Sequence, residues 1–483
     1  MKKNIPSNVV QDLAEWAIMH GVAFRQADNT ARHCPFSIAP IAIESSVFNH
    51  LKIVVPIVSK LINNISEDHD FLQSSLINLS EAEPFFARLL SLYQQGHGID
   101  GKRKYPKRQP LLLMRTDFMH DRVHGVKVIE FNGIAAGMAP FGQRASELHA
   151  YVKTQWPDTY SQFIEANGSK PVNNIGLEQM ALGISRAAKD IKTHFNEVGQ
   201  AVFVMVVQEN EDNVYDQHLL ELELNKYGVK TLRRTFEQLN GELSSGENGR
   251  LVLEGQIGVD VVYLRAGYQF EDYCAPELDE DICCHTLSQV RLFMEQHYVA
   301  INATISQQLA TSKSIQLSLT QMPEVEYQRW GLNLKEAKLV KNVLTDMKPL
   351  NRATIAWFNS HAKKSEWVLK NQGEGGGHCI FGDDITKKLL EIPAKDHNAW
   401  TFMKRIFPHE RENATLAIRN AEQTPINDLV SEIGLFSVFY KGQPATEFEG
   451  YAGYLIRSKP ASENEGGIHS GMGILDSLAL IDE

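Results

Sequence analysis

The segment 367–382 holds the residues whose types and spacing most clearly allow chemistry. Its sequence is WVLKNQGEGGGHCIFG. The apolar start predicts a strand that fixes Lys370 as a point charge, and Glu374 offers the hard oxygen that Mg²⁺ prefers. Gly375, Gly376 and Gly377 lack a Cβ, so their backbone N–H groups can approach anionic oxygens. The segment suits a nucleotide phosphate chain, and a plain Gly-rich hairpin turn is the alternative.

A second set of candidate ligands lies at the end of the strand-like run 126–131, which follows another run at 111–114 and a turn at 121–125. Alternation along a strand puts Glu130 and Asn132 on the same face. Two oxygen donors on one face suit a hydrated Mg²⁺. The alternative is that both residues only cap the turn after the strand.

Two further strand ends carry polar groups. The buried strand expected at 259–264 ends in Arg265, whose planar fork could clamp a substrate carboxylate, with an internal ion pair as the alternative. The segment 208–217 (QENEDNVYDQ) has amides and carboxylates that suit an α-amino acid head group. Helix capping by Asn213 and Asp216 is the alternative there.

The elements that must position these residues fall into three regions. Helical periodicity dominates 7–95, which we interpret as scaffold. Strand, helix and strand signals at 199–306 predict a parallel α/β lobe. Beyond 309, short strands alternate with Gly-rich loops, as in an α+β lobe that holds a nucleotide. The signals behind these last two regions are strands at 201–207, 229–232, 259–264, 367–370, 402–406, 428–440 and 454–459, and a helix at 216–227.

Composition limits the class of protein. The chain has 483 residues, 43% of them apolar, so it can bury a large core in two or three lobes. Its formal charge of −11 disfavours sequence-independent binding to nucleic acid or to an anionic membrane, and we take the basic cluster at 102–108 as a solvated loop. The apolar runs are too short to span a bilayer. Five cysteines without a C-x-x-C pair, and no secretory leader, predict a cytoplasmic protein.

Two common templates are missing from the sequence. It contains neither a G-x-x-x-x-G-K-[ST] phosphate loop nor an H-E-x-x-H zinc helix. Nucleotide phosphates must therefore be held in another way.

The order of the motifs resembles the eukaryotic-type glutathione synthetase family from about residue 70 to the C-terminus. The most specific matches are L-K-x-Q-x-E-G-G-G, S-E-x-G-x-F, and L-x-R-x-K followed by G-G. The resemblance implies an ATP-grasp fold of the α/β (α+β) class, with a helical N-terminal region and an inserted parallel α/β substrate-binding lobe. It also implies a homodimer that joins γ-glutamylcysteine and glycine with ATP and two Mg²⁺ ions. We expect parts at 1–198, 199–306 and 307–483, the last with Gly-rich lid loops.

The resemblance assigns roles to individual positions. Expected metal ligands are Glu130, Asn132 and Glu374, and expected catalytic residues are Arg457, Arg265 and Lys370. Expected ATP contacts are Glu130, Lys313, Lys370, Gln372, Glu374, Gly375, Gly376, Gly377, Phe381, Met403, Ile406, Glu432, Lys459 and Glu465. Expected substrate contacts are Arg115, Ile134, Ala135, Gly137, Glu211, Asn213, Gln217, Arg265, Tyr268, Arg457, Ile468 and His469.

The chain departs from the family pattern at several of these places. Ala135 and Gly137 stand where the family usually has two serines that contact the dipeptide. His469 and Ser470 replace small residues that shape the pocket for the last amino acid. Lys404 replaces an acidic residue near the adenine or ribose, and the His378-Cys379 pair replaces two asparagines. A small buried thiol is our interpretation of the cysteine.

Three hypotheses follow. The first is a glutathione-forming ligase that activates a carboxylate as an acylphosphate, which needs lysines, Mg²⁺ and arginines but no protein nucleophile. The second is a related ligase with another acceptor amine or γ-glutamyl donor. The third is a catalytically silent nucleotide-binding regulatory protein. ADP release with γ-glutamylcysteine and a panel of amines separates them.

Overall fold

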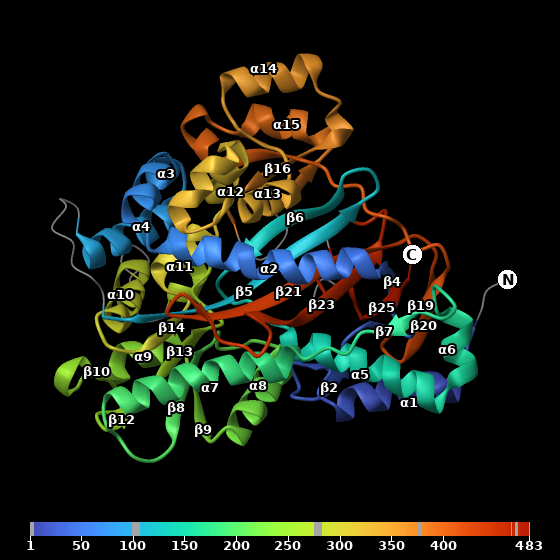
Figure 1. The fold of residues 1–483 in the computed structure, drawn as a ribbon, viewed down its shortest axis with the longest axis horizontal. Coiled ribbons are helices and arrows are strands. Elements are labelled where there is room, and N and C mark those ends of the chain that lie inside the picture. The colour runs from blue at the N-terminus through green and yellow to red at the C-terminus, as the bar shows by residue number, and fades with distance from the viewer. Residues whose placement is uncertain are drawn as a thin grey trace.

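The computed structural model describes residues 4–98, 107–274, 283–373, 379–464, 466–468 and 472–482. A long mixed sheet runs through the molecule, with helices on both faces (Figure 1). Over the described residues this sheet has 13 strands. Its mainly antiparallel part, in which β24 and β3 pair in parallel, contains β20 (Glu422–Ile426), β19 (Thr415–Arg419), β3 (Phe36–Ser37), β24 (Ile474–Asp476), β23 (Tyr451–Pro460), β21 (Leu429–Tyr440), β22 (Gln443–Pro444) and β6 (Gly125–Asn132). Its parallel part contains β14 (Ala300–Asn302), β13 (Val261–Leu264), β8 (Ala201–Val206) and β9 (Val229–Arg234).

Strand β5 (Gln109–Asp121) joins the two parts of the sheet. Its first two residues, Gln109 and Pro110, pair in parallel with β14. The rest pairs antiparallel with β21 on one side and with β6 on the other. The parallel α/β part and the antiparallel part therefore share one sheet, and polar residues along β5 lie at its centre.

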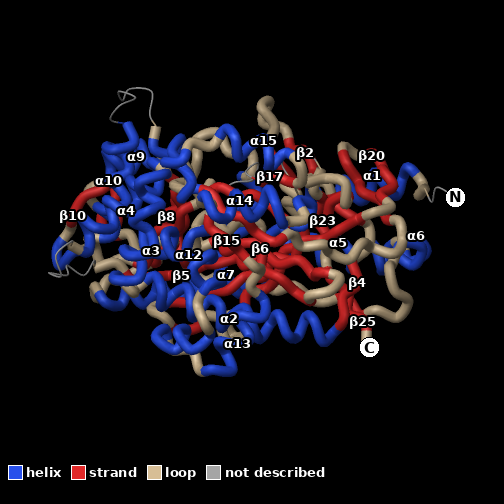
Figure 2. Tube along the Cα trace, turned by 90° about the horizontal axis from the view of Figure 1, so that it is seen from above, coloured by secondary structure: helices blue, strands red, loops and turns tan. Residues whose placement is uncertain are grey.

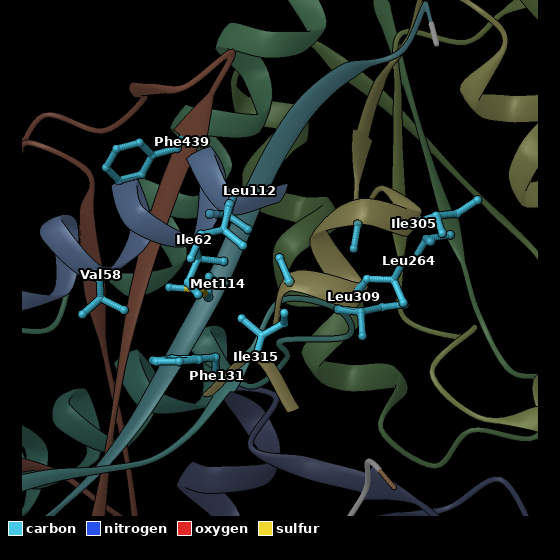
Figure 3. Packing of buried hydrophobic residues seen from close by; sticks show 14 of the residues in the cluster. Val58, Ile62, Leu112, Met114, Phe131, Leu264, Ile305, Leu309, Ile315 and Phe439 are labelled. Atoms are coloured by element: carbon cyan, nitrogen blue, oxygen red, sulfur yellow. The ribbon is translucent and has the colours of Figure 1, made fainter. Parts of the chain in front are cut away.

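Alternation along β5 divides the core into two layers. Leu112 and Met114 face one hydrophobic cluster, whereas Leu111 and Leu113 face the other. Figure 3 shows the first cluster, where Val58 and Ile62 of α2 lie with the even-numbered residues of β5. The helices contributing to it are α2 (Ser45–Ser66), α3 (His69–Ala82), α4 (Pro84–His97), α9 (Phe236–Glu242), α10 (Cys283–Glu295), α11 (Ile305–Ala310), α12 (Lys313–Gln321) and α13 (Leu334–Val343). The opposite cluster is covered by α1 (Ser7–Met19), α5 (Ala139–Gln155), α6 (Pro157–Phe163), α7 (Gly176–His194) and α8 (Val214–Lys226).

Helix α2 is the one described helix whose length and composition would allow it to cross a membrane. In this fold it lies along the sheet, beside α13 (Figure 2). Leu51, Val54, Val55 and Val58 are fully buried. The apolar face of α2 is therefore used to cover the sheet.

A smaller sheet stands apart from the large one, at the top of Figure 1. It consists of β15 (Met347–Pro349), β18 (Trp400–Lys404), β16 (Trp367–Asn371) and β17 (Cys379–Phe381), all antiparallel. Helices α14 (Arg352–His361) and α15 (Asp384–Glu391) pack on it around Trp367, Leu369 and Phe402. The minor sheets are β1 (Ala23–Arg25) with β2 (Ala31–His33), β10 (Leu243–Ser245) with β11 (Leu251–Leu253) and β12 (Ile257–Gly258), and β4 (Ile41–Glu44) with β25 (Leu478–Ile481) and β7 (Lys170–Pro171).

The mixed architecture agrees with the expected α/β class, and one local expectation was wrong. The region 7–95 is mainly helical, as expected, and β1 to β4 occupy much of 23–44. These strands have two to four residues, too few for a periodic signal. Arg108, placed in a solvated loop, is buried and bonds to Glu67 at 2.9 and 3.2 Å. The division at 198 and 306 stays a prediction.

Candidate active site

A cavity of about 800 Å³ lies where the β5–β6 hairpin and β23 face the small sheet. Segments from distant parts of the chain meet there. The sequence-predicted residues that line it are Arg115, Glu130, Asn132, Ile134, Ala135, Gly137, Glu211, Asn213, Arg265, Tyr268, Lys313, Lys370, Phe381, Met403, Ile406, Glu432, Arg457, Lys459 and Ile468. Gln217 and Gln372 are buried and do not line it.

Two arginines share one buried carboxylate beside the cavity. Arg115 on β5 donates from Nε and Nη2 to Oδ1 and Oδ2 of Asp117 at 2.6 and 2.8 Å, and Nη2 of Arg457 on β23 lies 3.3 Å from Oδ2. Burial favours the neutral carboxyl, but Arg115 and Arg457 outweigh it, so the pKa of Asp117 lies below its usual value. The charged carboxylate therefore fixes both guanidinium groups.

Arg457 has a second acidic partner. It is ion-paired with Glu432, which lies opposite it on β21. Burial raises the pKa of Glu432, and the nearby Arg457 offsets only part of the rise. Burial opposes the charge of Arg457, yet Glu432, Asp117 and Glu130 together raise its pKa. Arg457 thus stays cationic at the cavity wall.

Arg265 comes directly after β13 and is paired with two acids. Its Nη1 donates to Oδ2 of Asp216 at 2.9 Å, and its Nη2 donates to Oε1 of Glu211 at 3.3 Å. The two carboxylates outweigh burial and raise the pKa of Arg265. A Cβ on residue 137 would lie 1.9 Å from Nη1, so Gly137 provides the space that this guanidinium occupies. The internal ion pair exists, and the arginine still lines the cavity.

The start of α8 contributes acceptors to the same end of the cavity. Gln217 donates from Nε2 to Oε2 of Glu211 at 2.5 Å. Asn213 occupies the N-cap position, but its side chain makes no cap hydrogen bond. Its Oδ1 is buried and has no hydrogen-bond partner in the described part of the chain. Capping therefore does not explain Asn213, whose oxygen can accept from a substrate ammonium together with Glu211.

A hydrogen-bonded loop presents Tyr268. Gln208 donates from Nε2 to the Tyr268 hydroxyl at 3.1 Å and to Oδ1 of Asp272 at 2.6 Å. Oδ2 of Asp272 accepts the backbone N–H groups of Gly267 and Tyr268 at 2.7 and 3.1 Å. Burial, followed by the charge of Asp272, raises the pKa of Tyr268. The neutral phenol is held as a hydrogen-bonding group at the wall.

Two buried lysines reach the cavity from different elements. Lys313 begins α12 and donates from Nζ to the Gly373 carbonyl at 2.8 Å. Lys370 on β16 donates from Nζ to the Ile129 carbonyl at 3.4 Å. Gln372 accepts the N–H of Ser314 at 3.1 Å, which connects the end of β16 to the start of α12. Two ammonium groups so placed can neutralise phosphate oxygens.

The small sheet provides an apolar wall next to these lysines. Val368, Phe381, Met403 and Ile406 line it, which suits the faces of a purine base. Lys404 also lines the cavity, where the family usually has an acidic residue. A cation therefore stands near the expected position of the ribose.

The described residues include two of the three ligands expected for magnesium, Glu130 and Asn132. Asn132 donates from Nδ2 to Oδ2 of Asp117 at 3.0 Å and to the Arg115 carbonyl at 3.2 Å. Its Oδ1 accepts no hydrogen bond from the described residues, and the Glu130 carboxylate lines the same cavity. Two hard oxygens fit Mg²⁺. The third predicted ligand, Glu374, lies outside the described residues, among which no set of three acidic, His or Cys side chains could hold a metal.

Several predicted residues lie outside the part of the chain that the structure describes. These are Glu374, Gly375, Gly376, Gly377, Glu465 and His469, together with His378 and Ser470. Conversely, sequence reasoning gave no individual role to Asp117 or Asp272. It included Gln208 and Asp216 only as members of the segment 208–217, with capping as the alternative for Asp216. Of these residues, Asp117 was the easiest to predict from the sequence, because an acid two residues after Arg115 faces the same side of a strand.

Comparison with known proteins gives a consistent result. The family model described as the ATP-binding domain of eukaryotic glutathione synthase matches residues 3–480. A chloroplastic glutathione synthetase of Solanum lycopersicum is 30% identical over 99% of this chain and 86% of its own length. The glutathione synthetase of Homo sapiens is 25% identical over 96% of this chain and 94% of its own.

A solved structure shows the same fold. It is a glutathione synthetase-like effector from Globodera pallida in its apo form, with a TM-score of 0.71. The match covers 99% of this chain and 98% of the effector at 16% sequence identity. Because the sequence identity is low, this match supports the fold and carries no argument about function.

Proposed function

The chain belongs to the eukaryotic glutathione synthase family and is an ATP-dependent carboxylate-amine ligase with the ATP-grasp fold, and from this premise we propose that it joins γ-glutamylcysteine to glycine. One observation carries the proposal. Two buried lysines, an apolar wall for a base and two cationic arginines line a single cavity. These are the groups needed to bring a triphosphate and a carboxylate together.

The proposed reaction has two steps. An oxygen of the donor carboxylate attacks the γ-phosphorus of ATP, and the bond to ADP breaks. The amine nitrogen of glycine then attacks the acyl carbon, inorganic phosphate leaves, and the nitrogen loses a proton. Both steps depend on positioning and charge neutralisation rather than on a protein nucleophile.

The lysines and arginines divide this work. Lys313 and Lys370 neutralise phosphate oxygens. Arg457 stabilises charge on the reacting carboxylate, because it stays cationic at the wall beside Glu130. Arg265 has two acidic partners of its own, so we assign it to holding the donor together with Glu211.

Glu130 and Asn132 are the described residues that would hold magnesium, and two Mg²⁺ ions are expected. When bound, Mg²⁺ neutralises the phosphates and keeps the reacting oxygens in line. This assignment is supported by Oδ1 of Asn132, which accepts no hydrogen bond from the described residues, and by Glu130, which lines the same cavity as Asn132.

The remaining expectations concern the setting of the enzyme. The few cysteines of the sequence, which include no C-x-x-C pair, support a reducing compartment such as the cytoplasm. We also propose a homodimer, on the strength of the family membership. Small molecules are the proposed partners, and the charge of −11 argues against binding to nucleic acid or to a membrane surface.

The first prediction concerns turnover. Purified protein with ATP, Mg²⁺ and γ-glutamylcysteine should release ADP when glycine is added, and mass spectrometry should find glutathione. Lys370→Ala should lower kcat by about 100-fold or more, the usual cost of one lost charge-stabilising group. Lys363→Ala is the matched control, because that side chain is exposed next to the same strand, and it should keep wild-type turnover.

The amine panel decides between the alternatives. Turnover with β-alanine, serine or alanine in place of glycine would establish a related ligase with another acceptor. Turnover that needs another γ-glutamyl donor would fit the exchange of two serines for Ala135 and Gly137. No ADP release with any pair would leave a nucleotide-binding regulatory protein.

A further inference from the structure

Asp117 touches three of the predicted site residues and does not itself line the cavity. It lies in the interior of β5, and its side chain is fully buried. Its two carboxylate oxygens accept from Arg115, Asn132 and Arg457. These partners come from β5, β6 and β23, so one side chain connects three strands at the site.

The hydrogen bonds to Asp117 leave other polar atoms of Arg115 and Asn132 available to a ligand. Arg115 uses Nε and Nη2 for the fork with Asp117, so its Nη1 edge points toward the Gly137 carbonyl at 3.3 Å and toward the cavity wall. Asn132 uses its amide nitrogen, which leaves Oδ1 for a cation. Removing the carboxylate would free these groups to rotate.

A glycine on the neighbouring strand provides space for the Asp117 carboxylate. Gly434 on β21 is the register partner of Asp117. A Cβ at position 434 would lie 2.9 Å from Oδ1 of Asp117 and 2.9 Å from Cδ of Arg115. The glycine of the S-E-x-G-x-F motif therefore provides space for the pair of side chains.

We propose that Asp117 is a positioning residue that orients Arg115 and Arg457 toward the donor carboxylate. This inference rests on the proposed function. An alternative role in stability alone makes a different prediction, because a purely structural ion pair changes the free energy of unfolding and leaves substrate affinity unchanged.

The second prediction tests Asp117→Asn, which keeps the shape and removes the charge. We expect kcat/KM for γ-glutamylcysteine to fall about 100-fold, since misplacing a substrate group by about 1 Å has that effect. Calorimetric binding of γ-glutamylcysteine should weaken at least about 10-fold, whereas the affinity for ATP should change less than about 3-fold, because the nucleotide wall and the lysines are untouched.

The matched control is Asp260→Asn. Asp260 is also fully buried, and its Oδ1 lies 2.7 Å from Nη2 of Arg250, away from the cavity. Its loss should lower the thermal midpoint while leaving both affinities at the wild-type value. If Asp117→Asn behaves in the same way, the positioning role is refuted.

A second variant covers the case in which Asp117→Asn does not fold. Gly434→Ala places a methyl group against the same pair, and it should weaken γ-glutamylcysteine binding selectively. Unchanged binding in that variant would overturn the proposal. Failure of the proposed function is distinguishable, because the wild-type protein itself would then neither bind nor turn over γ-glutamylcysteine.

Discussion

At the scale of single residues, the site contains arginines that are each paired with a buried carboxylate. Arg115 and Arg457 are balanced by Asp117 and Glu432, and Arg265 is balanced by Asp216 and Glu211. Buried charges require such partners, because an unpaired one is costly to desolvate. The pairing fixes each guanidinium group in one orientation, so small changes next to it should alter substrate binding more than folding.

Gly137 gives the third prediction. Serine at this position would put a Cβ 1.9 Å from Nη1 of Arg265. The guanidinium is the end of a flexible side chain and can move, but it would then leave Asp216 and Glu211. Gly137→Ser should therefore lower kcat/KM for γ-glutamylcysteine about 10-fold or more, with a loss of at most about 1–3 kcal/mol in stability.

Gly241→Ser is the control for this substitution. A Cβ there meets no atom within 4 Å. Steady-state kinetics at varied γ-glutamylcysteine should match wild type in the control and differ in Gly137→Ser. Equal kinetics in all three proteins would mean that Arg265 does not contact the donor.

At the scale of elements, helix ends and strand ends determine which polar groups become functional. Helix α4 ends at His97, where the exposed carbonyls of a helix terminus normally favour a cation. Burial wins here and, with the nearby Arg108, lowers the pKa of His97 to about 4, although a hydrogen bond with the Tyr93 carbonyl favours the cation. His97 is therefore neutral at pH 7.

The fourth prediction follows from this pKa. Between pH 6.5 and about 4 the unfolded chain binds a proton at this position that the folded chain does not bind. The neutral His97 makes its full contribution to the free energy of unfolding above pH 6.5. As the pH falls toward 4, this free energy decreases by on the order of 1–3 kcal/mol. On going from pH 7 to pH 5, the thermal midpoint of the wild type should fall more than that of His97→Gln. Parallel decreases would show that the ring is already protonated at pH 7 or never becomes buried.

Sequence reasoning recovered the elements with strong local signals and missed what depends on distant partners. The hairpin of β5 and β6 was predicted, because alternation and the turn at 121–125 are local features. The burial of Arg108 was not, because its partners Glu67 and Glu295 lie far away in the sequence. The role of Asp117 was hidden for the same reason, since its contact with Arg457 depends on the pairing of β21 with β5 and β23.

At the scale of the whole molecule, one sheet holds the half of the cavity that we propose binds the donor acid, and a separate small sheet holds the half that we propose binds the nucleotide. Strand β5 links the parallel strands next to Arg265 with the antiparallel strands next to Arg457. The small sheet lines part of the cavity through β16, β17 and β18, and Lys370 comes from β16. A donor and a triphosphate bound to the two halves would meet between them.

The central claim is that phosphate is transferred directly from ATP to the donor carboxylate in this cavity, and an oxygen-transfer experiment tests it most directly. γ-Glutamylcysteine labelled with ¹⁸O in its cysteinyl carboxylate is turned over with ATP and glycine, and the phosphate is analysed by mass spectrometry. We predict one ¹⁸O atom in the inorganic phosphate for each glutathione formed, because the carboxylate oxygen leaves with phosphorus. Label recovered in AMP, or retained entirely in the peptide, would contradict the account.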